Sequence, residues 1–281
     1  MKQEDRARFD RALSRARPAA YQAGEFVEQE SFMRAGEILT LARRAGVGPG
    51  VSVLDVCCGV AGPGRLLARE TGCTYLGVDA SAEAVDIARG RAEGLDCRFE
   101  VGRVPPLPAG PFDVVLLLET LLAFADKDAL LRQVSAALEV GGRFAFTVEE
   151  GAALTGPERA AMPDADTVWP VPLPELLVAL ERVGLRVRWQ DELSAAHLDL
   201  VDTLAEAFAA DADHIVEHVG RRGFDELMAA HLLWSDWLRR GRVRKFALVA
   251  EKVRERQDGG TDNRGVKTAP TGHVALAAGR T

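Results

Sequence analysis

The side chains best placed to do chemistry in this sequence are two carboxylates, each at the end of an apolar run. Asp55 ends VSVLD and precedes a turn of small residues, VCCGVAGPG, while Asp79 ends YLGVD, 20 residues after Gly59. Small residues let the backbone approach a bound molecule closely, and a helix that follows presents free N–H groups to it. A carboxylate that ends the next strand can accept hydrogen bonds from both hydroxyls of a ribose. The pattern therefore predicts a nucleoside-binding unit.

Two classes of cofactor fit such a unit, the dinucleotides and S-adenosylmethionine. Gly59, Gly62 and Gly64 are spaced GxxGxG, whereas a dinucleotide-binding loop has GxGxxG. Asp79 could instead cap the helix that follows it, although Ser81 can also serve as that cap. The turn alone is weak evidence, but the turn, the spacing and the terminal carboxylate together indicate a nucleoside cofactor of one of the two classes.

The elements that must position these residues alternate between strand and helix. This alternation predicts βαβ crossovers and a parallel sheet, and the unbroken apolar run DVVLLL at 113–118 is typical of its central strand. We expect strands at 51–56, 74–79, 97–101, 112–118, 142–149, 185–190 and 245–253, with helices at 63–70, 81–92, 127–139 and 174–183. The expected organisation is a helical N-terminal cap at 1–45, a cofactor-binding core at 46–191 and 244–253, a helical lid at 192–243 and a disordered tail at 254–281.

Composition narrows the function classes further. A chain of 281 residues with 47% hydrophobic residues can form one large α/β domain or two modest ones. Its net charge of −7 disfavours nucleic-acid binding. The sequence has no apolar run of the ~20 residues that span a bilayer, and its charged N-terminus lacks the features of a signal peptide. Four cysteines without a CxxC pair are typical of a reduced, cytoplasmic protein.

The later strands carry a family resemblance. FDVVLLLETL at 112–121 and LEVGGRFAFTVEE at 138–150 resemble the fourth and fifth strand regions of class I S-adenosylmethionine-dependent methyltransferases. LRVRWQ at 185–190 and KFALVAEKV at 245–253 resemble the antiparallel hairpin that ends their sheet. The resemblance covers about residues 20–253 and is strongest to small-molecule enzymes that act on natural products and small amines. It implies a Rossmann-like, seven-stranded, mostly parallel sheet with an antiparallel last strand, a helical N-terminal segment and a helical lid.

The same resemblance implies the cofactor-binding residues. Asp55 falls on the position that holds the methionine amine, and Cys57 and Ala61 replace the outer two glycines of the family's usual triplet. Arg103 or Val104 stands where the family usually has an Asp that binds adenine. The expected cofactor-binding residues are Asp55, Cys57, Gly59, Ala61, Asp79, Ala80, Arg103, Val104 and Glu119, with Tyr21 and Gln29 from the N-terminal segment.

In an open parallel sheet the substrate lies beyond the carboxyl ends of the strands. This rule indicates Glu119, after the fourth strand, and Glu149 or Glu150, after the fifth, as a base or an ammonium-binding carboxylate. The alternative for Glu119 is a structural hydrogen bond, and for Glu149 and Glu150 it is an exposed strand end. His197 follows the sixth strand and is our first candidate for a general base. His214 and His218 have the i, i+4 spacing of metal ligands, but the segment is equally an ordinary polar helix face, and we expect no metal.

The predicted function is transfer of a methyl group from S-adenosylmethionine to an O, N or C nucleophile of a small organic acceptor in secondary metabolism. The alternatives are a cofactor-binding protein without methyl transfer, cyclase-like or regulatory, and an NAD(P)-dependent oxidoreductase. The expected partner is the small-molecule acceptor, with no nucleic acid and no membrane, and the chain is expected to be a monomer or homodimer. The fourth strand ends in ETLL rather than in the Pro-Pro-aromatic motif that stacks a flipped base.

Overall fold

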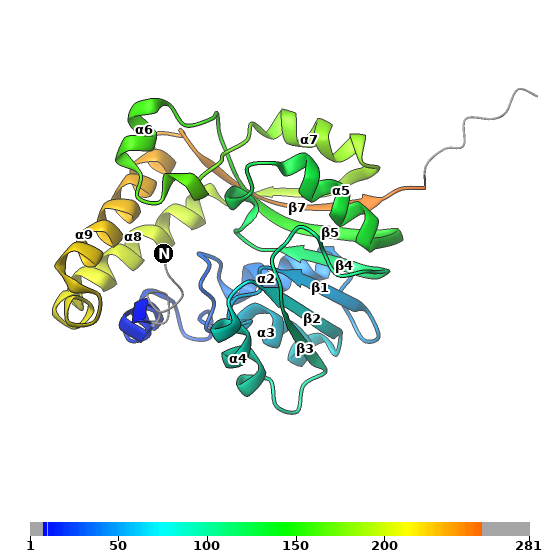
Figure 1. The fold of residues 1–281 in the computed structure, drawn as a ribbon, viewed down its shortest axis with the longest axis horizontal. Coiled ribbons are helices and arrows are strands. Elements are labelled where there is room, and N and C mark those ends of the chain that lie inside the picture. The colour runs from blue at the N-terminus through cyan, green and yellow to red at the C-terminus, as the bar shows by residue number, and fades with distance from the viewer. Residues whose placement is uncertain (1–7, 10, 255–281) are drawn as a thin grey trace, which may run out of the picture.

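A computed structural model describes residues 8–9 and 11–254 of the chain (Figure 1). Seven strands form one sheet in the order β3-β2-β1-β4-β5-β7-β6. The strands are β1 (Ser52–Val56), β2 (Thr74–Asp79), β3 (Cys97–Val101), β4 (Phe112–Leu117), β5 (Leu138–Glu150), β6 (Leu185–Glu192) and β7 (Arg244–Lys252). The longer helices are α2 (Ala35–Arg44), α3 (Gly62–Thr71), α4 (Ala82–Arg91), α5 (Lys127–Ala137), α7 (Leu173–Arg182), α8 (Ser194–Ala210) and α9 (Ala212–Arg239). Except for its first residue, the tail expected at 254–281 lies outside the described residues.

The sheet has the predicted Rossmann-like topology. Strands β1 to β5 run parallel to one another, and β7 runs antiparallel between β5 and β6. The central strand β1 pairs on both edges, with Leu54 opposite Leu76 of β2 and Val115 of β4. The fold class predicted from the alternation of elements and from the family resemblance is therefore confirmed.

Helices cover both faces of the sheet. On one face, Ile38 and Leu41 of α2 and Leu67 of α3 belong to a buried apolar cluster with Val53 and Leu116 of the sheet. On the other face, α5 and α7 pack on the strands through a second buried cluster, which includes Leu130, Leu131, Leu176, Leu180, Phe144, Phe146 and Leu248. This burial explains why the central strands are apolar on both sides, and it leaves the carboxyl ends of β1, β2 and β4 free to form a site.

A separate helical layer lies beyond this end of the sheet. Helices α8 and α9 pack on each other and on a short 3-10 helix, η1 (Arg17–Ala20), through an apolar cluster that includes Leu200, Leu204, Phe208 and Phe224 (Figure 1). Gly220 interrupts α9 with non-helical backbone angles (φ 77°, ψ 162°). Within the described part of the chain, every helix is too short or too polar to cross a membrane.

The segment 21–34 differs from the expectation of helices throughout the N-terminal region. It is irregular between η1 and α2, and Gly24 has a φ of 83°. The side-chain amide of Gln29 replaces helical hydrogen bonds here, because its Nε2 donates to the carbonyls of Glu25 (2.9 Å) and Met33 (2.7 Å). This loop brings residues 28–32 to the carboxyl end of the sheet.

Candidate active site

The turn after β1 is held by the carboxylate that ends β2. Asp79 Oδ2 accepts a hydrogen bond from the backbone N–H of Gly59 (2.9 Å), and Oδ1 accepts one from the N–H of Ser81 (2.8 Å). Ser81 itself caps α4 by accepting from the N–H of Ala84 (3.2 Å). Asp79 is therefore a bridge between turn and strand rather than the helix cap. A carboxylate has about four lone-pair sites, so two remain for other donors.

The turn has an unusual backbone. Cys57, Gly59 and Ala61 have φ values of 64°, 55° and 55°, all in the left-handed region. This conformation costs a residue with a Cβ roughly 1–2 kcal/mol, whereas glycine adopts it freely. Cys57 and Ala61, which stand where the family resemblance places glycines, thus keep a glycine-like backbone. At Gly59 an added Cβ would overlap the carboxylate of Glu30 and would force that side chain to move.

Asp55, at the end of β1, is buried with an exposed fraction of 3%. Its Oδ2 accepts a hydrogen bond from the hydroxyl of Tyr75 (2.6 Å). Burial raises the pKa of Asp55 to about 7, and the Tyr75 bond offsets only part of this effect. An added Cβ at Gly64 would overlap the Tyr75 ring. The glycine at this position therefore leaves space for Tyr75, whose hydroxyl orients Asp55.

These elements surround a cleft of about 390 Å³ at the carboxyl ends of β1, β2 and β4. Seven of the residues expected from the sequence to bind a cofactor line it: Asp55, Cys57, Gly59, Ala61, Asp79, Ala80 and Glu119. The loop at 28–32 also lines the cleft, with Glu28, Glu30, Ser31 and Phe32. The sequence indicated this segment through Gln29 and Phe32, but it gave no signal for Glu28, Glu30 and Ser31.

The other four expected cofactor residues lie outside the walls of this cleft. Tyr21 donates its hydroxyl to the carbonyl of Ser31 (2.9 Å), and Gln29 is buried inside its own loop. Both therefore support the loop at 28–32 from behind. Arg103 is exposed and Val104 is half-buried, both in the connection between β3 and β4. Their predicted contact with adenine stays a prediction.

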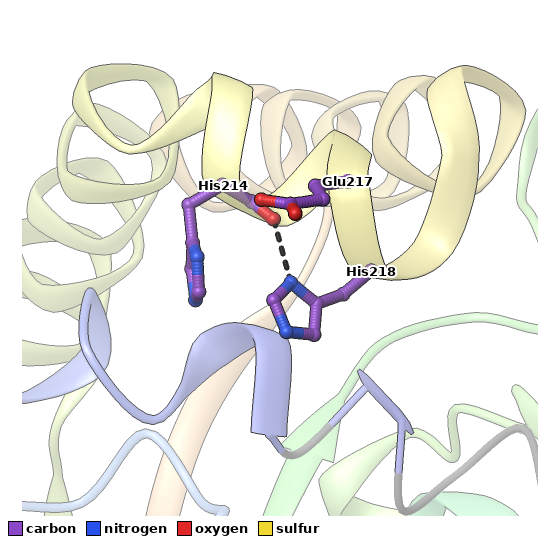
Figure 2. A group of neighbouring side chains, drawn as sticks. All are labelled: His214, Glu217 and His218. Atoms are coloured by element: carbon purple, nitrogen blue, oxygen red, sulfur yellow. Dashed lines mark hydrogen bonds between the residues drawn. The ribbon is translucent and has the colours of Figure 1, made fainter.

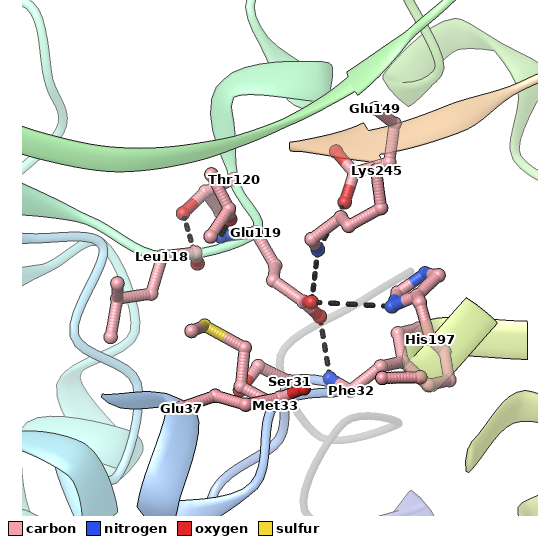
Figure 3. Close-up of polar contacts among 12 residues, drawn as sticks. Ser31, Phe32, Met33, Glu37, Leu118, Glu119, Thr120, Glu149, His197 and Lys245 are labelled. Carbon is pink, nitrogen blue, oxygen red and sulfur yellow. Dashed lines mark hydrogen bonds and ion pairs between the residues drawn. The ribbon is translucent and has the colours of Figure 1, made fainter. Parts of the chain in front are cut away.

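Glu119 connects the cleft to a buried group of charged side chains (Figure 3). It has a φ of 57°, and its backbone N–H donates to Thr147 Oγ1 on β5 (2.7 Å). One carboxylate oxygen accepts from the N–H of Phe32 (2.5 Å), and the other pairs with Lys245 Nζ. A non-glycine residue in this conformation indicates local strain that its surroundings impose; here they aim the carboxylate at Lys245.

Lys245, at the start of β7, bridges two carboxylates in the protein interior. Its Nζ also lies 2.7 Å from Glu149 Oε1, and its side chain is 1% exposed. Burial opposes the charge of Lys245, but the attraction of Glu119 and Glu149 outweighs it and raises the lysine pKa. Burial also raises the pKa of Glu119, an effect that Lys245 reduces. With both carboxyl groups ionised, the group carries one excess negative charge.

His197, on the first turn of α8, completes this group. Its Nδ1 lies 3.6 Å from Glu119 Oε1, and its Nε2 accepts a hydrogen bond from Trp234 Nε1 (3.3 Å). Burial lowers the pKa of His197 well below its usual value, and the charges of Lys245 and Arg34 lower it further. The ring is therefore neutral, with its proton on Nδ1. Its Nε2 can take a proton only after the bond from Trp234 breaks.

A second chamber adjoins the cleft. It has a volume of about 180 Å³ and shares Phe32 and Glu119 with the cleft. Its wall is mostly apolar, with Glu149 as a further charged residue; the other lining residues are Leu122, Met162, Val168, Ala230, His231 and Trp234. Met162 and Ala230 also line an outer cavity of about 770 Å³ between the segment at 160–164 and α9. The two inner cavities thus meet at one aromatic ring and one carboxylate.

His214, Glu217 and His218 form a separate group on α9 (Figure 2). Their potential ligand atoms lie within 4.8 Å of one another. His218 Nδ1 is hydrogen-bonded to the carbonyl of His214 (2.9 Å), which leaves only its Nε2 for an ion. None of the three lines the cleft or the chamber. The expectation that the chain holds no metal stays a prediction.

Fold and site define a class I methyltransferase architecture, and sequence comparison agrees. The sequence model of a methyltransferase domain family matches residues 53–142. The methyltransferase GfsG of Streptomyces halstedii is 38% identical over 120 residues, which are 40% of this chain. The chain spans only 43% of the length of GfsG. These findings show a methyltransferase domain at residues 53–142, in agreement with the predicted family, enzyme class and cofactor.

Solved structures support the fold over most of the chain. The cyclopropane synthase MmaA2 of Mycobacterium tuberculosis is similar with a TM-score of 0.73 and 14% identity, over 87% of this chain and 94% of that one. Phosphoethanolamine N-methyltransferase 2 of Haemonchus contortus, in complex with S-adenosyl-L-methionine, has a TM-score of 0.72 and 17% identity, over 88% of this chain and 60% of that one. At these identities the likeness concerns the fold.

Proposed function

We propose that this chain binds S-adenosylmethionine in the cleft and transfers its methyl group to a small, largely apolar organic acceptor held in the adjoining chamber. The observation that carries this proposal is the shared wall of the two cavities, where Phe32 and Glu119 face both. Methyl transfer needs a donor and an acceptor held in line with water excluded. Two adjoining cavities of unlike chemistry supply such an arrangement.

The residues of the cleft fit this cofactor. Asp79 keeps lone pairs for two ribose hydroxyls while it holds the turn, and the small residues 57–61 leave the backbone open to close approach. Asp55 offers a buried carboxylate for the methionine ammonium. When bound, the cofactor supplies a methyl group on a positively charged sulfur.

The acceptor side follows from the chamber. Trp234, Met162 and Val168 give it an apolar surface that favours an organic molecule over a polymer. We therefore assign the reaction to secondary metabolism, and we expect a reduced, cytoplasmic setting for it. Helices α8 and α9 would act as the lid that closes this chamber, since His231 and Trp234 lie on α9.

Proton removal is the remaining task when the acceptor is a hydroxyl, a protonated amine or a carbon acid. We propose Glu119, Glu149 and His197 as the groups that share it. Glu119 is the carboxylate that faces both cavities, and burial raises its pKa, which makes it a stronger proton acceptor than an exposed glutamate. His197 would orient Glu119 through Nδ1 as long as Trp234 occupies its other nitrogen.

Calorimetry with S-adenosylmethionine and its demethylated product, S-adenosylhomocysteine, tests the cofactor half of the proposal. We expect both to bind, and Asp79→Ala to weaken both by about 100-fold, because two hydrogen bonds to a charged group are lost. Asp86→Ala, an exposed carboxylate on α4 that pairs with Arg89, is the matched control and should bind as the unaltered chain does. Failure of the unaltered chain to bind either compound would overturn the proposal. Binding without methylation of any offered alcohol, phenol or amine would favour the cyclase-like or regulatory alternative.

A further inference from the structure

The acceptor chamber is small for an organic acceptor. Its volume is about 180 Å³, and an apolar cavity of about 150 Å³ accommodates a molecule the size of benzene. Sites that bind small organic ligands usually measure about 300–1,000 Å³. The chamber therefore has room for the reacting end of an acceptor, while the rest of a molecule of ordinary size must lie elsewhere.

The outer cavity is the space into which the rest of the acceptor can extend. It has a volume of about 770 Å³ and shares Met162 and Ala230 with the chamber. Because both residues line both spaces, a single layer of side chains separates the cavities there. Ala230 contributes only a methyl group from α9 to this layer, and methionine is an unbranched side chain that adapts its shape readily. The two residues thus mark a passage from the chamber to the outer cavity.

The wall of the outer cavity that faces α9 is held in place by the fold. It is formed by the end of α6 (Gly156–Ala161) and by the residues that follow this helix. Glu158 of α6 accepts hydrogen bonds from Arg242 Nε (2.6 Å) and Nη2 (3.0 Å). Arg159 Nη1 donates to the carbonyl of Ala165 (3.1 Å) and so spans the lining segment. Anchored elements therefore bound the cavity, and its lining can select a ligand.

The lining of the outer cavity favours an amphipathic molecule. Besides three alanines, its apolar residues are Phe9, Met162, Pro163, Val219 and Leu227. Its charged residues are two of each sign, Arg8, Arg222, Asp164 and Glu226. The side chains of Arg222 and Glu226 pair with each other (2.8 Å) and are 91% and 52% exposed, so these charges lie at the solvent edge. An apolar body suits the floor of this cavity, and an uncharged polar end suits a rim whose charges balance.

We propose that the acceptor is an elongated amphipathic molecule that occupies both spaces. Its reacting end lies in the chamber, its apolar body passes Met162 and Ala230, and its uncharged polar end reaches the rim of the outer cavity. Ala230 is then the residue that sets the length of the acceptor, because a larger side chain at this position closes the passage. This inference rests on the proposed function, since it assigns the chamber to the reacting end. It adds a second acceptor subsite and the shape and polarity of its ligand.

Two straight-chain alcohols test the passage: 1-hexanol, which is short enough for the chamber, and 1-decanol, which is too long for it. Each is titrated by calorimetry into the full chain saturated with S-adenosylhomocysteine. We expect 1-decanol to bind on the order of 100-fold more tightly, because each of its four further methylene groups contributes about fourfold when buried. In Ala230→Leu most of this gain should disappear. Ala229→Leu, at the adjacent exposed position of α9, is the matched control and should keep the gain.

A third probe tests the polar end. 1,10-Decanediol should bind as tightly as 1-decanol, because its second hydroxyl reaches the polar rim. If the diol bound at least tenfold more weakly, the assignment of an amphipathic acceptor would be wrong.

The ratio of the decanol and hexanol affinities decides the inference. A ratio near one in the unaltered chain, binding of neither alcohol, or a full gain in Ala230→Leu would overturn it. Met162→Ala widens the passage from its other side and should keep the gain, and loss of the gain in this variant would also contradict the passage. S-adenosylhomocysteine binding is measured first in every variant, so a failure of the cofactor site is distinguished from a failure of the second subsite.

Discussion

The cofactor cleft and the acceptor chamber are built by opposite strategies. The cleft is lined largely by two short stretches, 55–63 and 79–80, whose small residues bring backbone to its surface. The chamber is made of side chains from segments that are remote in sequence: Phe32 before α2, Glu149 on β5 and Trp234 on α9. A site formed by the backbone of a short, continuous stretch can be recognised in the sequence as a motif. A site made of distant side chains exists only once the chain has folded.

The cleft and the chamber also differ in how their buried carboxyl groups are partnered. In the cleft, Asp55 is a buried carboxyl group whose main partner is a neutral hydroxyl, that of Tyr75, and burial and the nearby Asp79 both raise its pKa. In the chamber, Glu119 and Glu149 are buried against the ammonium of Lys245. Ionisation of Asp55 in the cleft therefore destabilises the folded chain. In the chamber, the carboxylates and the ammonium of Lys245 stabilise one another. Substitutions in the two regions should differ in size and in sign.

The largest effect is expected from Lys245→Met. The substitution leaves two buried carboxylates without their cation, and breaking a buried pair in this way costs about 3–5 kcal/mol. Urea unfolding should show this loss near neutral pH. Burial already raises the pKa of Glu119, and Lys245 reduces this effect. Without the cation, the folded pKa of Glu119 therefore lies further above its unfolded value, and the variant should regain stability as the pH falls.

Lys252→Met is the matched control on the same strand. Lys252 Nζ donates to the carbonyl of Leu138 (2.7 Å) and has no carboxylate partner among the described contacts. Lys252→Met should lower the free energy of unfolding by no more than about 1.5 kcal/mol. Adding Glu119→Gln and Glu149→Gln to Lys245→Met should restore part of the lost stability. Equal losses for the two lysine variants would show that the chamber charges are not mutually dependent.

The comparison also explains what the sequence could predict. The ends of β1 and β2 and the small-residue turn were predictable because one short stretch contains strand, turn and helix start. Glu119 and Glu149 were predictable as candidates because they end parallel strands, which meet at one edge of the sheet. His197 was predictable from its place after β6, but its bond to Trp234 and its neutral state follow from packing.

Lys245 could not be predicted as a site residue. It begins the apolar run KFALVA, and a lysine at the start of a strand is usually solvated. Its burial arises because β7 inserts between β5 and β6 and pairs Lys245 with Glu149. The irregular path of the loop at 28–32 could not be predicted for a similar reason. The internal hydrogen bonds of Gln29 determine this path, and no periodic pattern in the sequence indicates them.

A smaller effect of opposite sign is expected in the cleft from Asp55→Asn. The amide oxygen can still accept the Tyr75 hydroxyl, but the penalised charge is gone. We expect the variant to be more stable than the unaltered chain near pH 8, by on the order of 2 kcal/mol, and to bind S-adenosylmethionine about tenfold more weakly. A gain of stability with a loss of binding would show that the cleft holds this charge for its ligand.

The stability of the unaltered chain should depend on pH through Asp55. The folded pKa of Asp55 is raised to about 7, and the unfolded value is about 4. The group therefore contributes stability that is fully present below about pH 4 and is lost as the pH rises through about 7. Unfolding curves of the unaltered chain should lose this stability across that window, and those of Asp55→Asn should not. Parallel curves for the two proteins would contradict the raised pKa.

The smallest effect, and the sharpest test of the backbone strategy, is expected from Ala61→Gly. Ala61 is fully buried with a φ of 55°, at the N-cap of α3. Glycine relieves roughly 1–2 kcal/mol of left-handed strain, but it loses a buried methyl group, about 0.8 kcal/mol, and gains about 0.4–1 kcal/mol of freedom in the unfolded chain. These terms nearly cancel, so the unfolding free energy should change by less than about 1 kcal/mol.

Ala68→Gly, in the interior of the same helix, is the matched control, because it relieves no left-handed backbone strain. Ala68 is also buried, but it lies within α3, where glycine costs about 1 kcal/mol relative to alanine before the methyl group is counted. Ala61→Gly should therefore be about 1–2 kcal/mol less destabilising than Ala68→Gly in the same urea titration. If the two losses were equal, the left-handed turn would be unstrained. The difference between cleft and chamber would then lie in their charges alone, and not in the backbone that the cleft presents to its ligand.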